Sequence, residues 1–400
     1  MGYYFGVKNP FKPRGQPCLS SKLYPLNFTL SKMGELTINR EKILQALGTV
    51  QEPDLKKDLV TLGMVRDITV GIDEVGFTIV LTTPACPLKE LIRKNCTDAI
   101  HSHFGDHIRV NVNLTADVTS TRLGGPMVPG VKNIIAVASG KGGVGKSTVT
   151  ANLAVALHRS GAKVGILDAD IYGPSMPVMF GVEDMQPLIA KKDGRNLMKP
   201  IQQWGIKIIS MGFLIPPDSA TVWRGPMASQ ALRQLFSDVD WEELDYLLID
   251  LPPGTGDVHL TLVQAVPVTG VVLVTTPQKV ALADAVRGAA MFRQPQINVP
   301  ILGVVENMAY FTPAELPENK YYLFGKGGGQ QLATQFGVPL LGSIPLVQGI
   351  REGGDEGRPA FLADDALTTE AFREAAEALA QQVAIRNASV EKTKAVEMKL

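Results

Sequence analysis

Residues 140–147 read GKGGVGKS, and this stretch decides the fold. It matches GxxxxGK[ST], the pattern of phosphate-binding P-loops. The apolar run IIAVA precedes it, and the helix-favouring run TVTANLAVALHRS follows it. Because a P-loop lies between a strand and a helix, the pattern predicts a strand, a phosphate-binding loop and a helix over residues 134–160.

The residue types in the loop suit a phosphate chain. Glycines let the backbone curl until its N–H groups point at phosphate oxygens, and the following helix offers its positive N-terminal end. Lys146 is expected to hold the β- and γ-phosphates, and the hydroxyl of Ser147 to bind Mg²⁺. A second lysine, Lys141, is expected to reach a γ-phosphate from its own or a neighbouring subunit. The expected phosphate-binding residues are Gly140, Lys141, Gly142, Gly143, Val144, Gly145, Lys146 and Ser147.

Outward from the loop, short apolar runs alternate with helical segments. The runs are IIAVAS, KVGIL, IKIIS, YLLID, GVVLVT, ILGVV and PLLGSI. Almost wholly apolar strands separated by helices predict a parallel sheet that is covered on both faces. The expected fold class is therefore α/β: a doubly wound, mostly parallel P-loop NTPase domain preceded by a small α+β domain.

Acidic residues follow two of these runs. Asp168 and Asp170 come directly after KVGIL, and Asp250 ends YLLID just before the rigid turn LPPG. The carboxyl ends of parallel strands form the ligand crevice of such sheets, so these carboxylates are expected near the phosphates, where they would hold Mg²⁺ and orient a water. The alternative, that aspartates only cap the next helices, is strongest for Asp257.

The first part of the chain has the pattern of a smaller α+β unit. A helix-like REKILQAL leads to the β-prone runs DITVGI and FTIVLTT and to the helical CPLKELIRKNCTDAIHSHF. A stretch rich in glycine and proline then marks a linker. The expected divisions are 1–32, a disordered or dispensable extension with Met33 as an alternative start; 33–116, the α+β domain; 117–133, the linker; 134–385, the P-loop domain; and 386–400, a polar tail.

The composition excludes several classes of protein. The 39 lysines and arginines balance 39 aspartates and glutamates, which removes the overall charge that would attract nucleic acid or anionic lipid. No apolar run approaches the roughly 20 residues of a membrane span. Cys18, Cys86 and Cys96 form an odd, widely spaced set that is typical of reduced thiols. We therefore expect a cytoplasmic protein with no nucleic-acid and no membrane partner.

Five motifs together resemble the Mrp/ApbC family of iron–sulfur cluster carrier ATPases. They are GKGGVGKS, DADIYGPSMP, VWRGPM, LDYLLIDLPPGTGDVHL and ENM. This family belongs to the deviant Walker A class, with the MinD and ParA ATPases, the nitrogenase iron protein and the arsenite pump ATPase. The resemblance implies an ATP-hydrolysing carrier that transfers clusters to apoprotein clients, works with assembly factors, and forms a homodimer around two ATP molecules.

The resemblance also implies roles for individual residues. Lys141, Lys146 and Asp170 would be catalytic, with Lys141 crossing the dimer interface to the partner's nucleotide and Asp170 positioning the attacking water. By the same resemblance, Asp168 and Asp250 would support Mg²⁺, and Gly254 would sense the γ-phosphate. Asn307 and Pro345 would receive the adenine.

The first domain resembles the SufT-like domain of iron–sulfur assembly factors through EPDLKKDLVTLGMVRDITV and LTTPACPLKELI. Cys86 lies in the ACP of the second stretch, just before a helix expected from Leu88 onward. Because a helix N-terminus lowers the pKa of a thiol, Cys86 is expected to be a transient ligand of a metal or of a [4Fe-4S] cluster. The alternative is that Cys86 is a small buried apolar residue.

The chain lacks one feature of this family. After ENMAYF the family usually carries a C-x-x-C pair, which in a dimer gives four thiolates to one [4Fe-4S] cluster. This chain has TPAEL at residues 312–316 and no cysteine after Cys96. Either the cluster binds elsewhere, through Cys86 with a partner's thiols, or the chain keeps the ATPase switch without the scaffold role. Two other functions stay open: a MinD/ParA-like positioning ATPase, and a nucleotide-binding scaffold without turnover.

Overall fold

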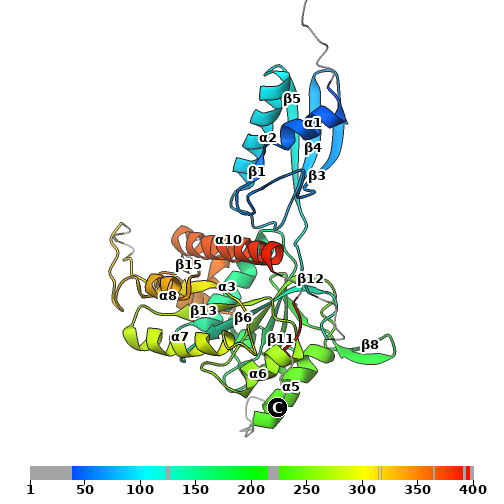
Figure 1. The fold of residues 1–400 in the computed structure, drawn as a ribbon. Helices are drawn as coiled ribbons and strands as arrows, with labels where there is room; N and C mark the ends of the chain where they lie inside the picture. Colours follow the sequence, from blue (N-terminus) through cyan, green and yellow to red (C-terminus); the bar gives the residue numbers. More distant parts are fainter. Residues whose placement is uncertain are drawn as a thin grey trace, which may run out of the picture. The chain divides into compact units, whose positions relative to one another are not determined.

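A computed structural model of the chain describes residues 38–122, 127–214, 225–313, 315–316, 318–363, 365–390 and 393–396. The expected N-terminal extension and Cys18 lie outside these ranges, as do residues 222–224 of the VWRGPM motif. Figure 1 shows the course of the chain.

The small α+β unit is built around a three-stranded sheet. Its order is β3 (Val65–Val70), β4 (Glu74–Leu81) and β5 (Arg109–Ala116), with β3 antiparallel and β5 parallel to β4. Helix α1 (Arg40–Leu47) precedes the sheet, and α2 (Lys89–Phe104) connects its parallel pair. A short ladder pairs β1 (Gln51–Glu52) with β2 (Lys57–Asp58). Ile43, Ile79 and Ile100 pack in the core of this unit.

The P-loop domain contains the parallel sheet that the apolar runs predict. Within the described residues, eight strands lie in the order β10-β11-β7-β12-β6-β13-β14-β15, and only β10 among them runs antiparallel to its neighbour. Their bounds are β6 (Val131–Ser139), β7 (Val164–Asp168), β10 (Ile201–Gln203), β11 (Ile206–Ser210), β12 (Leu244–Asp250), β13 (Gly270–Thr275), β14 (Ile301–Glu306) and β15 (Leu340–Ser343). The strands that carry Asp168 and Asp250 are adjacent, in register at these two residues.

Helices cover both faces of this sheet, as Figure 1 shows. Two separate apolar clusters result, one under α3 (Lys146–Arg159) and α10 (Ala366–Ser389), the other under α5 (Gly225–Ser237), α6 (Asp257–Ala265), α7 (Lys279–Phe292) and α8 (Gly328–Phe336). The expected fold class, a doubly wound α/β domain preceded by a small α+β domain, is confirmed. The remaining elements are α4 (Met176–Met179), α9 (Gln348–Asp355), the hairpin β8 (Ile189–Lys192) and β9 (Arg195–Met198), and two 3₁₀ turns at Met211–Phe213 and Ala360–Leu362.

The C-terminal segment differs from the polar, frayed tail expected from residue 386. Helix α10 continues to Ser389, and Arg386 is buried within it. Beyond the helix, the backbone N–H groups of Thr393 and Val396 donate to the carbonyls of Thr121 and Val263. The polar composition suggested a solvated end, but Thr393 is paired with the linker and Val396 with α6.

Candidate functional site

The P-loop follows β6, a strand that is buried along almost its whole length, and leads directly into α3. Gly143 and Gly145 have φ angles of 80° and 78°, which only glycine adopts readily. A Cβ on Gly145 would lie 2.2 Å from Nδ2 of Asn307. The first turn of α3 has no side-chain cap among the described residues, so its N–H groups stay available to a phosphate.

Lys146, at the start of α3, lies beside two aspartates. Its Nζ lies 2.8 Å from Oδ2 of Asp250, 4.0 Å from Oδ2 of Asp170 and 3.3 Å from Oγ of Ser147. Lys146 and Asp250 are both buried, with 6% and 0% of their side chains exposed. The two aspartate turns therefore do meet at the P-loop, as their positions after neighbouring strands predict.

Asp250 is held by two hydroxyl groups in addition to the lysine. Ser147 Oγ donates to its Oδ2 at 2.6 Å, and Thr150 Oγ1 donates to its Oδ1 at 2.9 Å. Thr150 lies outside the motif residues expected from the sequence. Its signal is the four-residue spacing from Lys146, which places both side chains on the same face of α3.

Ser147 and Asp250 provide oxygen atoms that suit Mg²⁺, and the carboxylate of Asp170 lies nearby. Magnesium prefers carboxylates and hydroxyls and keeps several of its waters. In this structure the ammonium group of Lys146 lies among these same oxygens. The residues present thus fit a magnesium ion once the lysine has moved toward a phosphate.

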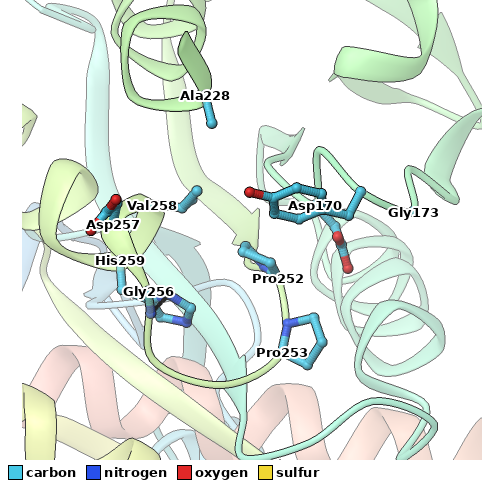
Figure 2. A pocket seen from close by; sticks show the side chains of 10 residues that line it. Asp170, Gly173, Ala228, Pro252, Pro253, Gly256, Asp257, Val258 and His259 are labelled. Carbon is cyan, nitrogen blue, oxygen red and sulfur yellow. Dashed lines mark hydrogen bonds between the residues drawn. The ribbon is translucent and has the colours of Figure 1, made fainter. Parts of the chain in front are cut away.

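Asp170 is partly exposed at the edge of this cluster. Burial raises its pKa, and the charge of Lys146 opposes that shift. Figure 2 shows the cavity beside it, which has a volume of about 640 Å³. Pro252 and Pro253 lie between Asp170 and the start of α6, which carries Asp257 and His259. A water beside Asp170 would therefore face the turn that follows Asp250.

Asp168 differs in its contacts from the other two aspartates. Its fully buried carboxylate accepts hydrogen bonds from the backbone N–H groups of Asp170, Ser175 and Met176 and from the hydroxyl of Ser210. Burial and the neighbouring charge of Asp250 raise its pKa to about 7. Its oxygens thus hold the loop that carries Asp170, and its expected support of Mg²⁺ stays a prediction.

The turn after Asp250 lies against the P-loop strand. The N–H of Gly254 donates to the carbonyl of Ser139 at 2.9 Å, and the φ of Gly254 is 90°. The amide that is expected to sense a γ-phosphate is therefore engaged elsewhere in this structure. A nucleotide would have to draw it away from Ser139.

Lys141, the second lysine of the loop, has a half-buried side chain and no ion pair among the described residues. Its backbone carbonyl accepts a hydrogen bond from Ser139 Oγ. A site on another subunit is not part of this single chain, so its reach across an interface stays a prediction.

Asn307 and Pro345 come together at the other end of the P-loop. Nδ2 of Asn307 donates to the carbonyl of Val144 at 2.8 Å. Both residues line a cavity of about 420 Å³ together with Gly145, Met308 and Ile350. This partly apolar hollow beside the loop has the character expected of a base-binding pocket.

The pKa of the Cys86 thiol differs from the expectation drawn from the sequence. Cys86 precedes α2 as expected, but it is buried, and desolvation raises the pKa of its thiol. The expectation of a lowered pKa is therefore wrong, because burial outweighs the nearby helix N-terminus. Desolvation also raises the pKa of Cys96, to about 12.

No group of three or more histidine, cysteine, aspartate or glutamate side chains is placed to hold a metal ion in the part of the chain that the structure describes. At the position of the missing cysteine pair, Thr312 is buried and Glu315 is exposed. Within the same described ranges, no helix has the length and apolar character needed to cross a membrane.

Two family models match the chain. One, described as NUBPL iron-transfer P-loop NTPase, covers residues 130–383, and the other, described as iron-sulfur cluster assembly protein, covers residues 40–113.

Among curated relatives, the iron-sulfur cluster carrier protein of Synechocystis is 48% identical over 87% of this chain and 97% of its own length. The protein of the same name from Deinococcus radiodurans is 46% identical over 87% of this chain and 97% of its own. Among solved structures, a nucleotide-binding protein of Archaeoglobus fulgidus in complex with ADP is 41% identical, with a TM-score of 0.51 over 59% of this chain and 90% of that one.

Proposed function

Because the chain belongs to the NUBPL iron-transfer P-loop NTPase family, we propose that it is an ATP-hydrolysing carrier that binds iron–sulfur clusters and delivers them to apoproteins. The relatives named as cluster carriers support the cargo. The second matching family, an iron–sulfur cluster assembly protein, supports it independently through the first domain. The observation that carries the nucleotide half of the proposal is the meeting of Lys146, Ser147 and Asp250 at the end of a P-loop.

Nucleotide binding begins with an exchange of partners. A triphosphate offers Lys146 a stronger partner than Asp250, because its oxygens carry more charge and the loop amides hold them in place. When the lysine moves, the oxygens of Ser147 and Asp250 become free to hold Mg²⁺, which would neutralise phosphate charge during the reaction. The adenine would occupy the cavity beside Asn307 and Pro345.

Hydrolysis then depends on Asp170 and the turn at Gly254. Asp170 lies at the open edge of the cluster, where its carboxylate can orient a water for in-line attack. The Gly254 amide, once released from Ser139, would donate to the γ-phosphate. Lys141 of a second copy would supply positive charge to the same phosphate, which makes the homodimer the hydrolysing unit.

An iron–sulfur cluster needs thiolate ligands, and this chain has no C-x-x-C pair to provide them. We propose Cys86 as one ligand, completed by thiols of a second copy, an assembly factor or a client. Because the thiol of Cys86 is buried and its pKa is raised, cluster binding requires the segment before α2 to open and the thiol to lose its proton. Loading is thus expected to depend on a conformational change of the small domain.

The test is phosphate release by the full chain, measured for the wild type, Lys146→Ala and Lys141→Ala together with iron content. Both variants are expected to lose activity, and Lys191→Ala, an exposed lysine on the β8–β9 hairpin, is expected to retain it. Wild-type protein that binds ATP but releases no phosphate would contradict the proposed hydrolysis.

Mixing two inactive variants tests the shared site. In a mixed dimer of Lys141→Ala and Asp170→Asn, one nucleotide site keeps its own Asp170 and receives an intact Lys141 from the other copy. Random mixing is then expected to restore about a quarter of the wild-type rate. A lysine that acts on its own subunit's nucleotide would restore none.

A further inference from the structure

The turn between Asp250 and α6 is fixed at three backbone amides. Leu251 N–H donates to the carbonyl of Val137 at 3.2 Å, and Gly254 N–H donates to the carbonyl of Ser139 at 2.9 Å. Gly256 N–H donates to Nδ1 of His259 at 3.3 Å. The first two bonds tie the turn to β6, and the third ties it to α6.

His259 accepts the third of these bonds from a buried position. Its side chain is fully buried, and its ring lies 6.2 Å from the ring of Phe292. Burial, reinforced by the charge of Lys146, lowers its pKa to about 4, so the imidazole is neutral at physiological pH. Because Nδ1 accepts the bond from Gly256, the proton is on Nε2, which has no partner among the described residues.

An unpaired buried donor costs free energy that an apolar side chain would avoid. Packing alone would therefore favour an apolar residue here. The advantage of a histidine at this position is the hydrogen bond that its Nδ1 accepts from Gly256. His259 is the third residue of α6, and its contact with Gly256 is the side-chain-to-backbone half of a capping box.

We propose that His259 is a positioning residue that anchors the far end of this turn, so that a γ-phosphate moves only the amide of Gly254. This inference rests on the proposed ATPase function. Gly254 is suited to the movement, since its φ is positive and a Cβ there would meet no atom of the described residues within 4 Å. With Leu251 and Gly256 both held, the reorientation of Gly254 is confined to a few bonds, and less conformational entropy is lost when the phosphate binds.

Two substitutions separate the hydrogen bond from the packing. His259→Gln keeps an acceptor of the kind that capping boxes use, whereas His259→Phe fills the space without an acceptor. The measurement is calorimetric affinity of the full chain for Mg²⁺·ADP and for a non-hydrolysable Mg²⁺·ATP analogue, with kcat and KM for ATP. His259→Leu is a second apolar variant if the Phe variant does not fold.

His259→Phe is expected to weaken binding of the ATP analogue about five-fold, the loss typical of a missing helix cap, and to leave ADP affinity unchanged. His259→Gln is expected to stay within about two-fold of the wild type. The inference is overturned if the Phe variant keeps the wild-type preference for the analogue, if Gln and Phe lose it equally, or if ADP affinity falls by the same factor. Wild-type protein that binds neither nucleotide would instead remove the proposed function, and this inference with it.

Discussion

Nζ of Lys146 lies 2.8 Å from Oδ2 of Asp250, so that the P-loop lysine and the aspartate at the end of β12 form a buried ion pair. Each partner compensates a charge that would be costly to bury alone. Ser147 also donates to this carboxylate, so one oxygen of Asp250 serves both groups. A nucleotide with Mg²⁺ would replace each of these contacts with a contact to phosphate or metal.

Asp250→Asn tests the ion pair. The neutral amide leaves Lys146 buried with only the more distant Asp170, so unfolding in urea is expected to need about 3 kcal/mol less free energy. Phosphate release is expected to fall about 100-fold or more, because charge at the reacting phosphate is no longer balanced. Asp193→Asn, at an exposed carboxylate in the turn between β8 and β9, is the matched control and should change neither quantity appreciably. Equal behaviour of the two variants would contradict the role given to Asp250.

Ser147→Ala and Thr150→Val separate the magnesium ligand from the support of Asp250. Each removes one hydroxyl that donates to this carboxylate. Only the Ser147 variant is expected to abolish the gain in ADP affinity that Mg²⁺ provides, as measured by calorimetry with and without the metal. A similar loss in both variants would contradict the separate role of Ser147, because the shared support of Asp250 would then account for it.

The sequence allowed the parallel sheet to be predicted because its strands are buried on both faces and read as apolar runs. Asp168 and Asp250 end two such runs, so their closeness to the loop also followed. The hairpin β8–β9 was not foreseen, because Leu197 and its neighbours mix polar with apolar residues in a stretch too short for a clear period.

Other features of the site depend on contacts between segments far apart in the chain. The bond of Ser210 to Asp168 joins β11 to β7, and local sequence contains no sign of it. The raised pKa of Cys86 likewise follows from burial by residues packed around it, which the position before a helix does not disclose. The spacing of the motifs therefore predicts where the charged groups lie. Their protonation states depend on burial, which only the folded structure shows.

The buried carboxylate of Asp168 is expected to make stability depend on pH. Its folded-state pKa of about 7 lies above its unfolded value, so the native state binds the proton more tightly. The contribution of this group to the free energy of unfolding therefore declines as the pH rises from about 4 through about 7.

Asp168→Asn removes this titration. In nucleotide-free protein, the free energy of unfolding of Asp168→Asn minus that of the wild type is expected to increase between pH 5.5 and pH 8. Urea unfolding at the two values measures it. A difference that stays constant or falls with pH would contradict the raised pKa of Asp168.

Cys86→Ala is expected to reduce the iron and sulfide that the full chain retains after anaerobic reconstitution. Cys96→Ala is the matched control, because Cys96 is buried in the middle of α2 with a strongly raised pKa. Cluster absorbance and iron content are the measurements. Equal retention by the wild type and both variants would exclude Cys86 as a ligand.

The most direct test of the account is titration of the purified full chain with ATP in a calorimeter, with Mg²⁺ present, beside Lys146→Ala. We expect the wild type to bind one ATP per chain and the variant to lose most of this affinity, because Lys146 must leave Asp250 to hold the phosphates. Absence of binding by the wild type, or equal binding by the variant, would contradict it.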